Sequence, residues 1–217
     1  LYQYNGLILK VQENFPEAMG QLFISIDGNY LYCNDLNSLD IFAYNLNEKK
    51  ITVKYDKLKS RAFMAPIKKD DYLIIADSTG NIYKYNVKDE NIKPQIIPAG
   101  AGILNVINKG NIFYFTASDG YFYKIDINLF RHAEKIVKLD DNPVIDKYLT
   151  KRLFLDGNKL YYSSDSGKLF EYNITSGKWN FIFISDNINK ISLIGQPVKI
   201  GDIVYFIDAE ANLYKLS

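Results

Sequence analysis

The sequence predicts an all-β protein of the β-propeller class, and three observations support that prediction. A unit of about 42 residues recurs along the 217-residue chain. Within each unit, apolar and polar residues alternate with the period of a β-strand. The chain also contains 18 Tyr and 13 Phe, and aromatic side chains favour the pleated, half-buried surface of a sheet.

The repeat is clearest in three stretches that follow the same order of residue types. They are "GNIFYFTASDGYFYKID" from Gly110, "GNKLYYSSDSGKLFEYN" from Gly157 and "GDIVYFIDAEANLYKLS" from Gly201. Two more degenerate copies begin at Gly28 and Asp70, so the five anchors stand 42, 40, 47 and 44 residues apart. Such a period is typical of propeller blades and exceeds the roughly 20 to 29 residues of leucine-rich repeats.

Each copy has three consecutive apolar residues that begin three positions after its anchor. In the copy from Gly157 they are Leu160, Tyr161 and Tyr162. Side chains of successive strand residues point to opposite faces, so a continuous apolar run indicates a strand that is covered on both sides. A unit of this kind needs a neighbour against each face of its sheet.

A polar turn follows this strand, and the alternating pattern then returns. One column is aromatic in every copy, and the residue after it is polar in most copies while the next is apolar. This alternation of period two predicts a further strand. The members of the aromatic column are Tyr2, Phe42, Tyr83, Tyr123, Phe170 and Tyr214.

Two weaker apolar stretches complete each unit. One precedes the anchor, as in "QLFISI", "ILNVI" and "RLFL", and the other follows the aromatic strand, as in "LILKV", "ITVKY" and "WNFIFI". Four short antiparallel strands per unit, without helical periodicity, predict propeller blades. We therefore expect residues 1–217 to form one propeller domain or segment of about five blade-equivalents, with helix in fewer than about 5% of residues.

Composition excludes several classes of protein. A net charge of +1 provides no basic footprint for nucleic acid. The longest apolar runs, such as "IVYFI", have about five residues, whereas a membrane helix needs about 20, so we expect no transmembrane segment. Cys33 is the single cysteine, which excludes an internal disulfide and a cysteine metal cluster. We expect it to be a buried, inert thiol, compatible with both cytosol and periplasm.

The copy "DGNKLYYSSDSGKLFEYNITSGKW" resembles the repeats of the quinoprotein-like (PQQ-type) propeller superfamily. That superfamily's signature is roughly A-x-D-x-x-T-G-x-x-x-W. The closest match here has its Trp displaced, and the chain has no second Trp. The device that locks adjacent blades through Trp in the enzyme members is thus missing, and we expect Tyr and Phe to pack the blade interfaces instead. The matching residues are Tyr172, Asn173, Thr175, Gly177 and Trp179.

The resemblance implies a non-catalytic member of the superfamily. Quinoprotein dehydrogenases of this fold hold a quinone and calcium with a vicinal disulfide, a Trp floor and an acidic base. A chain with one Cys and one Trp cannot supply that set. The better comparison is with the outer-membrane β-barrel assembly lipoprotein (BamB-like) and with accessory propellers of periplasmic respiratory enzymes. This comparison favours the periplasm or cell envelope, with the cytoplasm as the alternative, and implies no cofactor.

One other turn motif suggests a different family. "SSDSGKLF" is similar to the Asp-box of sialidases through Ser163, Asp165, Gly167 and Phe170. The box stabilises the fold far from the catalytic centre in that family, so the match implies no chemistry. A sialidase also needs three convergent arginines, and the chain's three lack the family's "RIP" context: Arg61, Arg131 and Arg152.

Candidate metal and catalytic groups are sparse. His132 is the only histidine, and a lone histidine builds neither a zinc site nor a catalytic pair, so we expect it on a surface loop. Asp35 and Asn37, together with residues 38–40, bring oxygen ligands close together in the sequence, as calcium loops do. They lack the bidentate Glu, and a plain Asx-turn is the preferred interpretation. We therefore predict no catalytic residue and no metal site.

Function in propellers is carried mainly by loops. The connections between blades are expected at 12–19, 56–62, 98–102, 139–150 and 185–195, and all are predicted on one face. Exposed apolar, aromatic and Arg residues on these loops are typical interface material. We predict a non-enzymatic scaffold that binds protein partners through this face, and the alternative is a sugar- or quinone-acting enzyme whose catalytic residues lie outside this segment. The candidate partner-binding residues are Phe15, Arg61, Pro143, Ile145, Tyr148 and Arg152.

The two ends of the chain generate a testable prediction. Residues 1–5 and 213–217 match the same strand of the unit, so five units leave one surplus strand. We favour a segment of a larger propeller over a closed five-bladed ring, and we expect residues 1–5 and 7–11 to pair as a hairpin through the Asn5-Gly6 turn. An open segment exposes apolar faces and should self-associate, as measured by sedimentation. A monomer whose first hairpin pairs with residues 196–217 would establish the closed ring.

Overall fold

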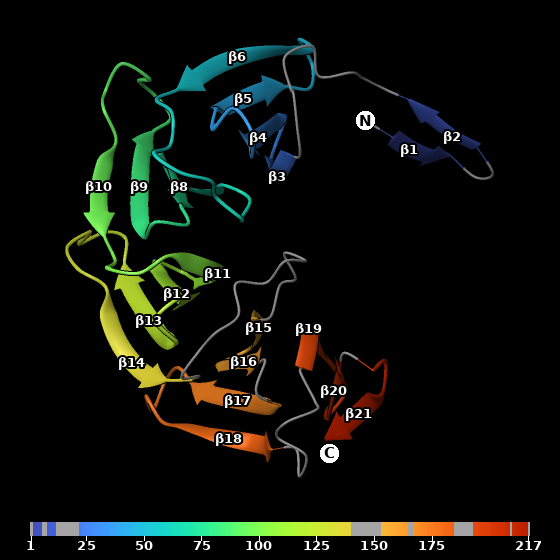
Figure 1. Ribbon diagram of the computed structural model, residues 1–217. Helices are drawn as coiled ribbons and strands as arrows, with labels where there is room; N and C mark the ends of the chain where they lie inside the picture. Colours follow the sequence, from blue (N-terminus) through green and yellow to red (C-terminus); the bar gives the residue numbers. More distant parts are fainter. Residues whose placement is uncertain are drawn as a thin grey trace. The chain divides into compact units, whose positions relative to one another are not determined.

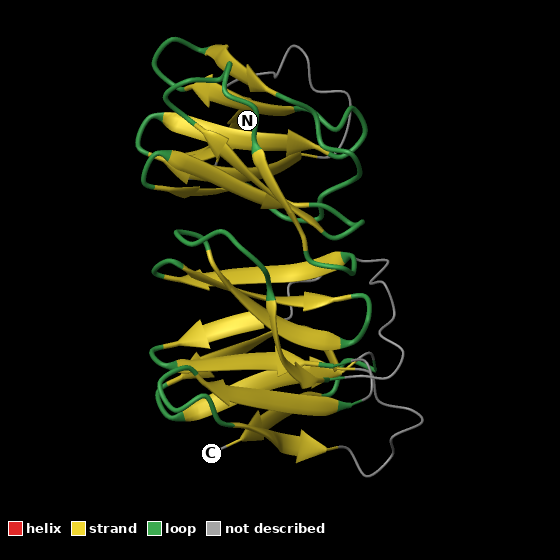
Figure 2. Cartoon of the chain, turned by 90° about the vertical axis from the view of Figure 1, so that its left-hand side faces the viewer, coloured by secondary structure: helices red, strands yellow, loops and turns green. Residues whose placement is uncertain are grey.

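The computed structural model describes residues 2–5, 8–11, 22–139, 153–164, 167–184, 193–208 and 210–216. The chain divides into two compact units, Leu1–Ile96 and Ile97–Ser217, which are described separately below. The regular structure of the described residues is entirely β-strand (Figures 1 and 2). Among these residues, no helix is long and apolar enough to cross a membrane. The all-β prediction is confirmed.

The first unit begins with an antiparallel hairpin of two strands, as expected, with Tyr2 opposite Val11 and Asn5 opposite Ile8. Two four-stranded sheets follow, which we call blades 1 and 2. The boundary between the two units falls within the last strand of blade 2. The hairpin consists of β1 (Tyr2–Asn5) and β2 (Ile8–Val11). Blade 1 consists of β3 (Leu22–Asp27), β4 (Tyr30–Asp35), β5 (Ile41–Asn45) and β6 (Lys50–Tyr55). Blade 2 consists of β7 (Ile67–Lys69), β8 (Tyr72–Ala76), β9 (Asn81–Asn86) and β10 (Gln95–Pro98).

The second unit contains blades 3, 4 and 5. Each is a sheet in which consecutive strands are hydrogen-bonded neighbours. Blade 3 consists of β11 (Ile103–Lys109), β12 (Ile112–Ala117), β13 (Tyr121–Asp126) and β14 (Glu134–Lys138). Blade 4 consists of β15 (Leu153–Asp156), β16 (Lys159–Ser163), β17 (Lys168–Asn173) and β18 (Trp179–Ile184). The described strands of blade 5 are β19 (Leu193–Ile200), β20 (Ile203–Asp208) and β21 (Leu213–Leu216).

The anchors of the repeat are the turns between the first and second strands of each blade. All five have positive φ, for example 54° at Gly157 and 49° at Asp70. Glycine adopts this conformation without a Cβ penalty, and Asp is among the few other residues that tolerate it. The anchor column therefore reflects a backbone requirement of the hairpin.

The second strand of each of blades 1 to 4 is buried on both faces, as the apolar columns predict. In blade 4, Leu160, Tyr161 and Tyr162 are each less than 5% exposed. Leu160 and Tyr162 belong to a hydrophobic cluster shared with blade 3, whereas Tyr161 belongs to one shared with blade 5. Successive side chains of one strand thus support two different interfaces.

Aromatic side chains join neighbouring blades. Tyr55 of blade 1 meets Tyr85 of blade 2 with ring centroids 5.5 Å apart. Phe122 of blade 3 lies 5.5 Å from Phe170 of blade 4, edge to face. These geometries are the favourable ones for aromatic pairs. The expectation that Tyr and Phe pack the blade interfaces is confirmed within each unit.

Blade 5 has one apolar face that no other described blade of its unit covers. Leu213 stands just before the aromatic column and is 69% exposed, whereas Leu169, at the same position in blade 4, is fully buried. Ile207, which pairs with Leu213 across the sheet, is 37% exposed. The propeller fold covers this face of every interior blade, so the exposed face is consistent with part of a larger propeller.

Truncation of these two equivalent leucines should lower the free energy of unfolding by different amounts. We expect Leu169→Ala to lower the free energy of unfolding by about 2 to 5 kcal/mol, because it opens a cavity between blades 4 and 5. Leu213→Ala should cost less than about 1 kcal/mol, because its side chain already faces solvent. Urea unfolding of both variants measures the difference, and equal costs would show that Leu213 is covered in solution.

Candidate functional site

The candidate site is one end of each blade. This end carries the turn from the second to the third strand, together with the connection that enters from the preceding blade. We call it the loop end. In blade 2, Ser78 N donates to Arg61 O of the entering connection at 2.7 Å. In blade 3, Ser118 N donates to Gly102 O at 2.7 Å, and Ser118 Oγ accepts from Gly102 N at 3.0 Å. Backbone hydrogen bonds therefore tie the connections to the turns.

Of the two connections between blades that the structure describes, the one at residues 56–62 is held more firmly. Leu58 and Ala62 are buried in the cluster shared by blades 1 and 2. Lys59 N donates to the hydroxyl of Tyr83 at 3.0 Å, and Ala62 O accepts from Asn34 Nδ2 at 2.9 Å. Because buried side chains and hydrogen bonds alternate along it, this loop has a defined conformation.

The same connection presents positive charge. Lys57, Lys59 and Arg61 alternate with the anchoring residues and are exposed. Lys57 Nζ pairs with Asp40 Oδ1 at 3.0 Å, which leaves Lys59 and Arg61 as the residues that carry the local charge. A rigid backbone with outward cations is suited to binding carboxylates on a partner.

An Asp-Tyr pair closes the turn of three blades. In blade 2, Asp77 Oδ1 accepts from the amides of Thr79 and Asn81 at 3.0 and 2.9 Å, and Oδ2 accepts from the hydroxyl of Tyr83 at 2.7 Å. Blade 5 repeats this pattern, with Tyr214 donating to Asp208 at 2.8 Å. The shared spacing of "DSTGNIY" and "DAEANLY" is a signal that could have identified the motif from the sequence.

Blade 3 forms its Asp-Tyr pair from a different position in the turn. Tyr123 donates to Asp119 Oδ2 at 2.5 Å, and Lys135 Nζ lies 3.2 Å from the same oxygen. Burial alone would raise the pKa of Asp119, but the hydrogen bonds from Tyr123 and Lys135 outweigh it and hold that pKa below its usual value. Burial, together with the bond to Asp119, raises the pKa of Tyr123 to about 12. The pair is thus a structural support for the turn.

In blades 1 and 4 the aromatic residue is Phe, and the turn is closed without a tyrosine hydroxyl. Asp35 Oδ1 accepts from Asn37 N at 2.8 Å, which is the Asx-turn preferred above over a calcium loop. In blade 4, Ser164 Oγ accepts from Lys168 N at 3.1 Å. The turn chemistry therefore varies among blades whose strands share one pattern.

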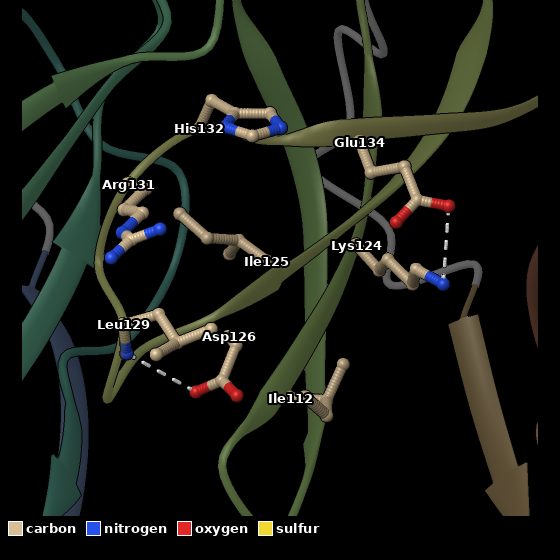
Figure 3. A pocket seen from close by; sticks show the side chains of 8 residues that line it. All are labelled: Ile112, Lys124, Ile125, Asp126, Leu129, Arg131, His132 and Glu134. Carbon is tan, nitrogen blue, oxygen red and sulfur yellow. Dashed lines mark hydrogen bonds and ion pairs between the residues drawn. The ribbon is translucent and has the colours of Figure 1, made fainter.

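A pocket of about 240 Å³ lies at the opposite end of blade 3 from the loop end (Figure 3). Its carboxylates are already engaged: Lys124 pairs with Glu134 at 3.2 Å, and Asp126 accepts from Asn128 N at 2.8 Å. The rest of the lining consists of Arg131, His132 and apolar side chains. The lining residues are Ile112, Lys124, Ile125, Asp126, Leu129, Arg131, His132 and Glu134.

The structure describes only part of the predicted site. Arg61 is exposed at the loop end, as expected. The other predicted partner-binding residues lie outside the described residues: Phe15, Pro143, Ile145, Tyr148 and Arg152. Asp165 of the Asp-box match also lies outside them, and Arg61 and Arg131 belong to different units, so the sialidase hypothesis stays untested.

Two expectations for single residues are confirmed. His132 is exposed between β13 and β14. Cys33 is fully buried, and burial raises the pKa of its thiol to about 12, which makes it unreactive. No group of three His, Cys, Asp or Glu side chains within the described residues is arranged to hold a metal ion.

Comparison with known proteins supports the fold. No family model matches the sequence, and no curated protein matches it. Among solved structures, BamB from Moraxella catarrhalis matches with a TM-score of 0.69 and 14% identity, covering 98% of this chain and 65% of that one. The computationally designed protein Ika8 matches with a TM-score of 0.64 and 12% identity, covering 89% and 57%.

A second designed protein, Ika4, has a TM-score of 0.54 and 12% identity, covering 81% of this chain and 99% of that one. The chain therefore spans about three fifths of the length of the first two structures. At these identities the likeness shows the fold alone. The β-propeller fold predicted from the repeat is confirmed.

The Asp119-Tyr123 pair predicts a pH dependence at the alkaline end. The folded-state pKa of Tyr123, about 12, exceeds its ordinary value of 10.0. Its contribution to stability is therefore complete below about pH 10 and is lost as the pH rises through about 12. We expect the free energy of unfolding of the wild type to approach that of Tyr123→Phe over this interval. Urea unfolding at both pH values tests this, and a constant difference would contradict it.

Proposed function

We propose that the protein is a non-enzymatic scaffold of the cell envelope that binds a protein partner through the loop end of its blades. The observation that carries this proposal is the connection at residues 56–62. It is anchored by Leu58 and Ala62 and held by Tyr83 and Asn34, yet it keeps Lys59 and Arg61 exposed. No other loop of the described residues combines these features as fully.

Preorganisation gives this arrangement its physical advantage. A flexible loop loses conformational entropy when it binds, at about 0.5 to 1.5 kcal/mol for each immobilised side chain. Here the folded blades have already ordered the backbone, so binding orders only the tips of Lys59 and Arg61. Cations on a rigid loop attract acidic segments and set their register. The resemblance of the repeat to BamB-like propellers supports the envelope location and the absence of catalysis.

The experiment that tests this function compares the two ends of blade 2. A photo-cross-linking amino acid replaces Lys59 at the loop end, or Lys93, which is exposed in the connection from β9 to β10 at the opposite end. The full native protein is expressed in its own host, and adducts are identified after cell fractionation. We expect a defined protein adduct in the envelope fraction from position 59 and none from position 93.

The matched charge variants complete this test. Arg61→Glu should weaken the adduct formed from position 59 by about tenfold, because it replaces an attractive charge with a repulsive one. Lys93→Glu, with the same change of charge at the other end, should leave the adduct intact. Equal effects of the two variants, or adducts at position 93 alone, would refute the loop end as the binding face.

A further inference from the structure

Blades 1 to 4 each end in an outer strand that has an open edge. Such edges present unpaired backbone groups, and proteins protect them with charged residues or proline to prevent unwanted pairing. Three of the outer strands carry such residues: β6 has Lys50 and Lys54, β10 ends in Pro98, and β14 has Glu134, Lys135 and Lys138. These strands follow the expected protective pattern.

The outer strand of blade 4 departs from this pattern. β18 has the sequence WNFIFI, with neither charge nor proline over its six residues. It is the last strand in the order β15-β16-β17-β18, and within the described residues it pairs only with β17. Figure 1 shows it at the outer margin of the blade. An unprotected apolar edge of this length is a template for a further strand.

The exposed tryptophan of β18 is held in place by its neighbours. Trp179 is 43% exposed, and its ring lies 5.7 Å from that of Phe181, edge to face. It also lies 6.1 Å from Phe170, which is only 1% exposed. Trp is the residue most often found at the energetic centre of protein interfaces, and a ring that is already packed loses little entropy on binding.

The charge around β18 indicates the chemistry of its partner. Lys178 is exposed beside Trp179, and Lys168 Nζ lies 5.1 Å above the ring of Phe181. No acidic residue occurs between positions 174 and 184, and Glu171, which lies opposite Asn180 on β17, is paired with Lys159 at 3.1 Å. An added strand that alternates apolar and acidic side chains would match both the aromatic surface and the two cations.

We propose that β18 is a docking edge at which an extended acidic and apolar segment of a partner protein adds as a fifth strand of blade 4, with Trp179 as its anchor. The backbone groups of the open edge supply affinity, and the aromatic pair with its flanking lysines supplies selectivity. β18 begins at Trp179, which lies on the side of the blade away from the loop end. Failure of this edge to bind would therefore leave the loop-end proposal intact.

The single tryptophan provides a direct measurement on the full chain. The probe is a synthetic peptide of about seven alternating valine and glutamate residues, a length that matches one strand. Its addition should shift the emission of Trp179 to shorter wavelength, since strand addition removes water from the indole. The same peptide with alternate backbone nitrogens methylated should bind at least about tenfold more weakly, because it cannot complete the ladder.

A gatekeeper variant and its matched control identify the edge. Asn180 lies between Trp179 and Phe181 in the sequence and is exposed, and Asn180→Glu adds a charge of the same sign as the acidic peptide. We expect like-charge repulsion to weaken peptide binding by at least about tenfold, whereas Gln95→Glu, on the outer strand of blade 2, should have no effect. Urea unfolding confirms that both variants fold.

Three outcomes would overturn the proposal. The first is equal binding of the methylated and unmethylated peptides, and the second is equal binding by wild type and Asn180→Glu. The third is concentration-dependent dimerisation in sedimentation that Asn180→Glu abolishes, which would make a second copy of this chain the occupant of the edge.

Discussion

The structure depends on the burial of the second strand of blades 1 to 4 on both faces. A strand such as β16 has Leu160 and Tyr162 on one face and Tyr161 on the other, so a single partner sheet cannot bury all three side chains. The blade is therefore not an independent folding unit, and its stability comes from its neighbours. The same requirement explains the many tyrosines and phenylalanines, because large flat side chains fill the space between twisted sheets.

Buried tyrosines create a second requirement, since a hydroxyl removed from water needs a hydrogen-bond partner. The structure meets this need with groups at the loop end: Tyr83 binds Asp77, and Tyr85 donates to Asp56 O at 2.9 Å. The Tyr83 hydroxyl also accepts from Lys59 N. In this way the core orders the connection at residues 56–62, and the loop that presents Lys59 and Arg61 is an extension of the interface between blades 1 and 2.

The outer strands experience a weaker constraint. The open edge of each outer strand needs no neighbour for the blade to fold, so sequence is free to vary there. That freedom makes the contrast between two outer strands informative. Three of the five residues of β14 are charged, whereas β18 has no charged residue. Phe181 and Ile182 of β18 pack against the clusters shared with blades 3 and 5, but Trp179 is 43% exposed, so packing does not account for the whole strand.

Much of the fold was predictable from the sequence, because it depends on local periodicity. The recurring anchors predicted the hairpin turns, the continuous apolar columns predicted strands buried on both faces, and the Asn5-Gly6 dipeptide predicted the first hairpin. Of the predicted partner-binding residues, Arg61 could be placed at the loop end by the repeat alone. In each case a short stretch of chain contains the whole signal.

Other features required the tertiary structure, because they join residues that are far apart in the sequence. The bond from Lys59 N to Tyr83 and the difference in burial between Leu169 and Leu213 are examples. Leu169 and Leu213 occupy the same position in the repeat, and local sequence gives them the same expected environment. Only the presence or absence of a neighbouring sheet distinguishes them, since burial is a property of the packed neighbours and not of the residue itself.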